Sequence, residues 1–154
     1  MKKILTLLFI AVILATIGCQ EDNPNEIYYP FKNEIWQRFN ILSFELSVEK
    51  ADKPYKIVLF ARHNRDFPFK ALDFNMVMNT PSGEERINEY HLKVKNRAGE
   101  FLGSCENEIC KATIVLKKEI YITKSGLLLI ELENLTPRLE TPGLLGVGVR
   151  IEKR

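Results

Sequence analysis

The chain has 154 residues, of which 45% are hydrophobic and 27% are charged. The first 18 residues hold two of its 22 basic residues and none of its 20 acidic ones, so the rest of the chain is close to neutral. Neutrality argues against a nucleic-acid partner, because binding of nucleic acid requires a clustered basic surface that displaces counterions from phosphates. Residues 19–154 match the common size of a single domain.

The N-terminus begins with Met1-Lys2-Lys3, continues with an apolar run over residues 4–17 and ends in Gly18-Cys19. A basic start followed by an apolar run too short to span a membrane is typical of a secretory signal peptide. The small residue before cysteine indicates a lipid-attachment site, so we predict that residues 1–18 are removed and Cys19 is acylated, with chains such as palmitate. More than one acyl chain would anchor the protein stably to a membrane. The alternative is an uncleaved anchor with Cys19 as a plain thiol.

Polar and acidic residues follow the cysteine, with a proline and no periodicity. This composition predicts a flexible acidic tether over residues 19–31 and a folded domain over residues 32–154. An acidic run directly after a lipidated cysteine also resembles a signal for export to the cell surface.

Aromatic residues gather where the predicted domain begins: Tyr28, Tyr29, Phe31 and Trp36. Two interpretations stay open, a stacking platform for a ligand and ordinary contacts in the core.

Hydrophobic residues alternate with polar ones from residue 42 onward, the period-two pattern of strands with one buried face. Strands are predicted over residues 42–48, 72–78, 90–94, 127–132 and 146–151, and a more continuously apolar strand, as expected near the middle of a sheet, over residues 55–61. Residues 112–116 and 120–122 are predicted to form one long or two short strands. Turn-forming residues separate them, and no segment has helical periodicity over three turns. This spacing predicts an all-β fold, an antiparallel β-sandwich of jelly-roll or Greek-key type.

Cys105 and Cys110 are the cysteines left after Cys19, and in an oxidising envelope they can close a small loop by a disulfide. Such a loop contributes about 2 kcal/mol at most by chain entropy. A tetrahedral metal site would need three or four Cys, His or carboxylate ligands, and His63 and His91 lie far from the cysteines in sequence. We therefore predict no metal.

Motifs that indicate catalysis or a cofactor are absent from the sequence: it has no Gly-x-Ser-x-Gly elbow, phosphate loop or dinucleotide fingerprint. Paired carboxylates, as in a glycoside hydrolase, depend on spacing in the fold rather than in the sequence. A surface hydrolase is therefore the least favoured of the functional hypotheses. We predict a protein that is not an enzyme and binds no cofactor.

Several segments, taken together, resemble one family. Trp36 lies a few residues before a predicted strand, Phe67-Pro68-Phe69 precedes another, and residues 143–152 read Gly-Leu-Leu-Gly-Val-Gly-Val-Arg-Ile-Glu. With residues 55–62 and Pro81-Ser82-Gly83, these segments resemble the gliding motility lipoproteins GldH of the Bacteroidetes. The C-terminal segment is the most specific part. Where the family tends to have Gly-x-Trp-x-Gly, residues 99–103 carry Phe101.

The resemblance implies a non-enzymatic lipoprotein, anchored to the outer membrane through the lipid on Cys19, on its periplasmic or cell-surface side. It also implies a link to gliding motility and type IX secretion, with envelope proteins of that machinery as partners. Arg150 is expected on the face of the last strand opposite Val149, where it is available to a carboxylate. We name Trp36 and Arg150 as candidate interaction residues.

The sequence leaves two main hypotheses for the function of the domain. The first is an interaction module that docks to envelope proteins through a sheet face or edge. The alternative is a carbohydrate-binding envelope lipoprotein in which Tyr28, Tyr29 and Trp36 stack on sugar rings. The alternative requires Trp36 to be exposed, so a buried Trp36 would exclude it.

Overall fold

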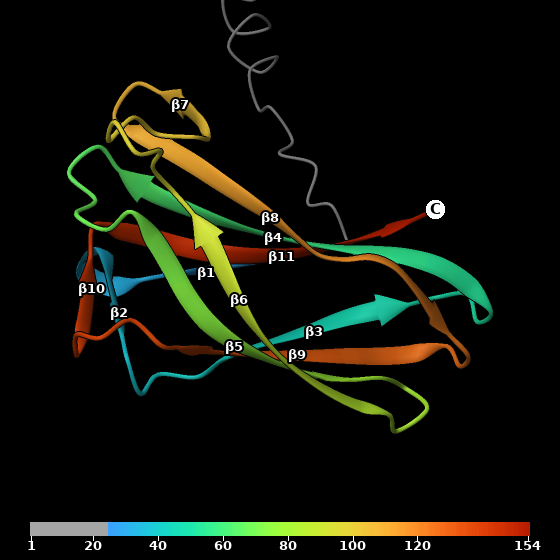
Figure 1. Ribbon diagram of the computed structural model, residues 1–154. Helices are drawn as coiled ribbons and strands as arrows, with labels where there is room; N and C mark the ends of the chain where they lie inside the picture. Colours follow the sequence, from blue (N-terminus) through green and yellow to red (C-terminus); the bar gives the residue numbers. More distant parts are fainter. Residues whose placement is uncertain (1–24) are drawn as a thin grey trace, which may run out of the picture.

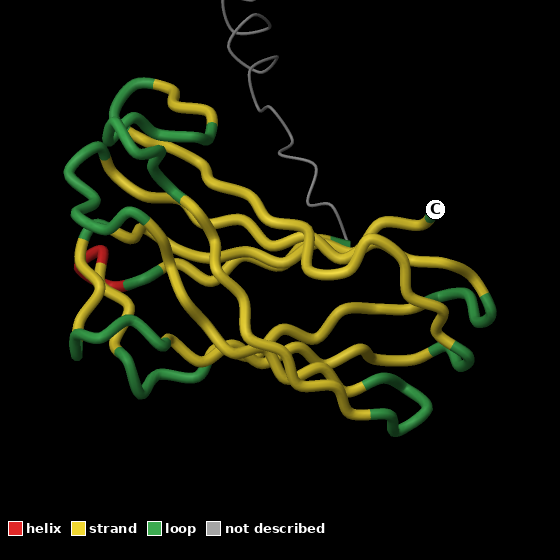
Figure 2. Tube along the Cα trace, viewed as in Figure 1, coloured by secondary structure: helices red, strands yellow, loops and turns green. Residues whose placement is uncertain are grey.

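The computed structural model describes residues 25–154, which form two facing antiparallel β-sheets (Figure 1, Figure 2). This confirms the predicted antiparallel β-sandwich. The predicted signal peptide, the acylation of Cys19 and the first residues of the predicted tether lie outside the described residues. Within the described part, no helix is long and apolar enough to cross a membrane.

Five strands form one sheet and four form the other, and a short two-stranded sheet lies at one end (Figure 1). The five-stranded sheet has the order β1 (Glu26–Pro30), β11 (Leu144–Lys153), β4 (Lys53–Asn64), β8 (Ile109–Ile122) and β7 (Ser104–Glu106). The four-stranded sheet has the order β3 (Leu42–Val48), β9 (Gly126–Asn134), β5 (Ala71–Asn79) and β6 (Glu85–Lys93). The short sheet pairs β10 (Glu140–Pro142) with β2 (Ile35–Gln37), which follows a 3-10 turn over Lys32–Glu34.

Strand β3 shows why the sequence forms a sandwich. Its residues alternate strictly between buried and exposed, so Leu42, Phe44 and Leu46 enter the core while the residues between them face solvent. Strand β4 is buried more continuously because Val58 and Phe60, on its outer side, are covered as well. Each large aliphatic or aromatic side chain buried in this way contributes about 1.5–3 kcal/mol.

The predicted boundary between tether and domain is wrong. Residues 26–30, assigned to the tether, form strand β1, which pairs antiparallel with β11 from Glu26 opposite Arg150 to Pro30 opposite Gly146. An edge strand of five residues is held by backbone hydrogen bonds to a distant segment and needs no hydrophobic alternation of its own. The folded domain therefore begins before residue 32.

The three shortest strands also escaped prediction. Strands β2, β7 and β10 have three residues each, too few to show a period. Residues 112–116 and 120–122, expected as one long or two short strands, belong to the single strand β8. Register shifts in its pairing with β4 near Ile57 explain the break in the apolar pattern.

His63 is a buried titratable group in strand β4, with 1% of its surface exposed. Its ring lies between Phe67 and Phe101, with centroids 5.1 and 4.8 Å away, and Nδ1 donates to the Asn64 carbonyl oxygen at 2.9 Å. Burial lowers the pKa of His63 below 6.5; the Asn64 hydrogen bond opposes this shift and the charge of Lys95 adds to it. Burial therefore disfavours the protonated form of this imidazole in the folded protein.

This burial predicts a loss of stability in mild acid. Above pH 6.5 the imidazole is neutral in both states; below it, the unfolded chain gains a proton that the folded chain resists, so the free energy of unfolding falls as pH drops toward the lowered pKa. We expect urea midpoints to fall between about pH 7 and pH 5, and to fall less in His63→Phe. The exposed His91→Gln variant serves as the control. Equal slopes for His63→Phe and the wild type would contradict the prediction.

Candidate interaction surfaces

Trp36 is a core residue. Strand β2 places its side chain with 0% of the surface exposed, stacked on Phe31 at a centroid distance of 5.6 Å. Its Nε1 donates to the Asn40 carbonyl oxygen at 2.8 Å, and its own carbonyl oxygen accepts a hydrogen bond from Asn134 at 3.4 Å. Of the two interpretations, the core contact is therefore confirmed for Trp36 and the stacking platform is excluded. Trp36 is wrong as a candidate interaction residue, and the carbohydrate-binding hypothesis, which required its exposure, is wrong as well.

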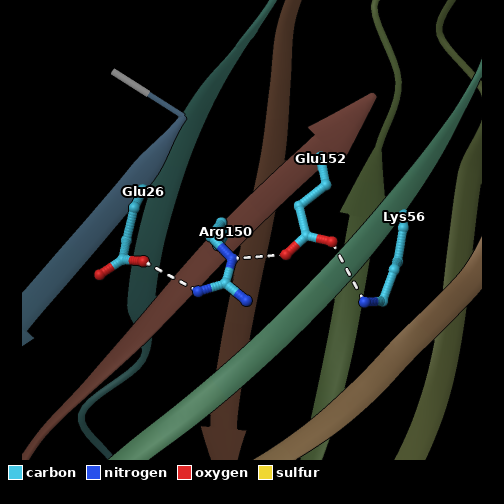
Figure 3. Close-up of polar contacts among 4 residues, drawn as sticks. All are labelled: Glu26, Lys56, Arg150 and Glu152. Atoms are coloured by element: carbon cyan, nitrogen blue, oxygen red, sulfur yellow. Dashed lines mark hydrogen bonds and ion pairs between the residues drawn. The ribbon is translucent and has the colours of Figure 1, made fainter. Parts of the chain in front are cut away.

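Arg150 links two carboxylates on the outer face of the five-stranded sheet (Figure 3). Its Nε donates to Glu152 Oε1 at 2.7 Å, and its Nη1 lies 3.4 Å from Glu26 Oε2. Lys56 Nζ lies 3.1 Å from the other oxygen of Glu152. Charges of alternating sign thus cross β1, β11 and β4. The hydrogen bond from Lys56 lowers the pKa of Glu152, desolvation opposes this, and Arg150 lowers it further.

Both carboxylates that Arg150 contacts come from its own chain. The side chains of this network are about one quarter to one third exposed, so water screens the ion pairs and each contributes at most about 1 kcal/mol. The network joins edge strand β1 to its neighbours. Contact of Arg150 with another protein stays a prediction.

Aromatic rings cover the glycine positions of β11. A Cβ atom added at Gly146 would lie 2.3 Å from Tyr28 Oη, and one at Gly148 would lie 2.1 Å from Phe60 Cζ. The two rings are nearly parallel, with centroids 6.0 Å apart. Burial raises the pKa of Tyr28, and Arg62 opposes the shift. The glycine pattern at the C-terminus therefore serves close packing on the outer face.

The two predicted partner cysteines face each other in register, Cys105 on β7 and Cys110 on β8, and their sulfur atoms are bonded. The disulfide closes a hairpin whose tip residue, Asn107, has a positive φ of 53°. Arg65 Nε donates to the Asn107 carbonyl oxygen at 2.7 Å, which ties the hairpin to the loop after β4. Residues 25–154 contain no cluster of His, Cys, Asp and Glu that could hold a metal ion.

The outer face of the four-stranded sheet is acidic. The register places six carboxylates on the outward positions of β3, β9, β5 and β6, and Lys93 is the only Lys or Arg at those positions. The six acidic residues are Glu45, Asp73, Glu85, Glu89, Glu131 and Glu133.

Neutral or titratable donors, rather than Lys or Arg, contact these carboxylates. Ser43 donates to Glu131 at 3.4 Å, Asn75 donates to Glu133 at 3.2 Å, and His91 Nδ1 lies 2.5 Å from Asp73. Most of the negative charge is therefore left uncompensated by Lys or Arg within this face.

Apolar side chains interrupt the acidic face. Ile87 and Leu127 are 63% and 59% exposed, and Ile41, just before β3, is 57% exposed. Ile41 and Ile87, together with Val77 and two of the glutamates, line a hollow of about 270 Å³. This surface was not predicted, because alternation in one strand indicates only which side is buried. The polar positions of residues 42–48, 72–78 and 127–132, taken together, are the sequence signal that indicates it.

The family model described as GldH lipoprotein matches residues 25–151, which include every strand from β1 to most of β11. The chain belongs to the GldH lipoprotein family. This confirms the resemblance seen in residues 36–152, and the match begins before residue 32, in agreement with the place of β1 in the domain.

Two relatives of the GldH family match nearly end to end. The chain is 22% identical over 152 residues to the gliding motility lipoprotein GldH of Flavobacterium johnsoniae, covering 93% of this chain and 94% of that protein. It is 21% identical over 153 residues to a gliding motility lipoprotein GldH homolog of Christiangramia forsetii, covering 95% of this chain and 93% of that protein. A solved structure of infectious bursal disease virus, Gx strain, gives a TM-score of 0.26 at 10% identity, covering 82% of this chain and 32% of that chain. A score this low supports no conclusion.

Proposed function

We propose that the protein is a non-enzymatic lipoprotein, acylated at Cys19 and anchored to the outer membrane, that works in gliding motility and type IX secretion by binding other envelope proteins. Membership of the GldH family and relatives named as gliding motility lipoproteins support the process. The signal-like sequence of residues 1–19 supports the anchor.

The observation that carries the binding role is the outer face of the four-stranded sheet. Exposed isoleucine side chains that share a hollow are costly for a surface that faces only water and are typical of a protein interface, and the carboxylates that line this hollow have no Lys or Arg partner among residues 25–154. Charge complementarity indicates the partner: a protein that presents lysine or arginine around an apolar contact. Cys19 would keep the domain at the membrane, so the sheet face would be free to bind.

A site-specific cross-link tests this role. We expect a photo-reactive residue at Ile87 of the tagged full-length protein to capture, in cells, a component of the motility or secretion machinery, identified by mass spectrometry. Tyr121 is the matched control, because it is 60% exposed against 63% for Ile87 and lies on the other sheet. The same adduct should be lost in a Glu131→Lys, Glu133→Lys variant, because the charge that attracts the partner is reversed.

Two results would contradict the proposal. The first is that a cross-linker at position 87 captures only abundant membrane proteins. The second is that a cross-linker at position 121 captures the same components with equal yield. Core substitution at Phe44, which is 0% exposed, provides the unfolded reference and should abolish the specific adduct.

A further inference from the structure

Arg62 on β4 and Lys111 on β8 lie directly opposite each other on the outer face of the five-stranded sheet. Like charges in this position destabilise a strand pair, so a negative partner would be expected. Among residues 25–154, neither side chain forms an ion pair with a carboxylate. On the same strand β4, Lys56 does have a carboxylate partner, Glu152.

Both cations make cation–π contacts with aromatic rings. The Arg62 guanidinium carbon lies 5.1 Å from the centroid of the Tyr28 ring, and Lys111 Nζ lies 4.1 Å from that of Phe60. Phe60 is 1% exposed, so the ammonium group of Lys111 lies against a buried ring. Cation–π contact of this kind fixes where the charges lie but does not neutralise them.

A hollow of about 420 Å³ opens beside the two cations and is lined by Arg62, Lys111 and Ser104. Ser104 on β7 lies opposite Lys111, so its hydroxyl shares the row with both cations. The segment before Ser104 lies close against β8, since a Cβ atom at Gly103 would lie 1.9 Å from the Lys111 carbonyl oxygen. The Cys105–Cys110 disulfide and the hydrogen bond from Arg65 to Asn107 constrain the β7–β8 hairpin on this side of the hollow.

One carboxylate, Glu106, lines the same hollow. It pairs with Ile109, two residues along β8 from Lys111, which corresponds to about 7 Å along the strand. The backbone of Glu106 therefore lies one row away from the row that holds Arg62 and Lys111.

From this arrangement we propose that the hollow binds a phosphate monoester. A monoester carries a charge of about −1.5 to −2 at pH 7, which matches two cations, whereas a carboxylate would leave one unmatched. The planar guanidinium donates two parallel hydrogen bonds to such a group and the ammonium acts as a point charge. The hollow is larger than a phosphate, so its carrier is either a small soluble molecule or a lipid headgroup.

Calorimetric titration of the full-length protein in neutral detergent tests the site, with glycerol 3-phosphate as the soluble probe and dihexanoyl phosphatidic acid as the lipid probe. We expect at least one to bind, the tighter one identifying the carrier. Arg62→Gln and Lys111→Gln should each weaken binding by about tenfold or more, because each removes a charge-assisted hydrogen bond. Lys56→Gln, which removes a paired lysine from the same strand, should leave binding unchanged.

Three outcomes would overturn the site. Neither probe binds; binding persists in the Arg62→Gln, Lys111→Gln double variant; or acetate binds as tightly as glycerol 3-phosphate, which would show no preference for a monoester. Circular dichroism of each variant establishes that it is folded, and Lys111→Arg, which keeps the charge, should retain much of the affinity.

Discussion

Replacing Trp36 by alanine is expected to lower the free energy of unfolding by about 3–5 kcal/mol, a large share of the stability of a single domain. The substitution removes a side chain with 0% of its surface exposed, its stacking on Phe31 and its hydrogen bond to Asn40. Urea unfolding should be followed by far-ultraviolet circular dichroism, because Trp36 is the only tryptophan and its loss removes the natural fluorescent probe.

Phe39 supplies the matched control for this experiment. It is another aromatic residue three positions along the chain, but it is 81% exposed, so Phe39→Ala should change the free energy of unfolding by no more than about 0.5 kcal/mol. Trp36→Phe should fall between the two, since it keeps most of the ring volume and loses the N–H donor. Equal stability of Trp36→Ala and Phe39→Ala would mean that the burial of Trp36 contributes no more to the free energy of unfolding than an exposed aromatic residue does.

Local patterning explains which strands could be predicted. Strands β3 and β5 each have one core face and one solvent-facing side, so their alternation is visible in the sequence itself. Strand β1 depends instead on β11, at the opposite end of the chain, and β2 depends on β10. Backbone pairing between distant segments leaves no periodicity in the local sequence, so the composition predicts a tether where β1 forms.

Pairing between distant segments also decides which candidate site residues could be predicted. Trp36 was visible as a residue of interest, but the burial of its side chain depends on the short β2–β10 sheet and on Phe31. Arg62 and Lys111 stand far apart in sequence, and only the β4–β8 register brings them together. The acidic sheet face arises in the same way, so near-neutral total charge concealed a surface with strongly negative character.

The glycines of the C-terminal strand offer the second large effect. Gly148→Ala is expected to destabilise the fold by about 1–3 kcal/mol, because the new methyl group would overlap the Phe60 ring, whose Cζ and Cε1 would lie 2.1 and 2.5 Å away. The Phe60 ring contacts both Tyr28 and Lys111, so to avoid the methyl group it would have to give up these contacts and leave its buried position. Chemical denaturation of the single and double variants measures the cost.

A double-mutant cycle tests whether the Phe60 ring causes the cost of Gly148→Ala. Leucine lacks the ring atoms that meet the methyl group, so Gly148→Ala should cost much less in a Phe60→Leu background. Gly146→Ala should behave differently, because its methyl group would also lie 2.5 Å from the backbone carbonyl oxygen of Tyr29, and trimming Tyr28 to leucine leaves that clash in place. Rescue at both positions would mean that β1 can move away from β11; rescue at neither would mean that the rings do not impose the glycine pattern. Rescue at Gly148 alone would show that side chains require one glycine and the β1–β11 backbone contact requires the other.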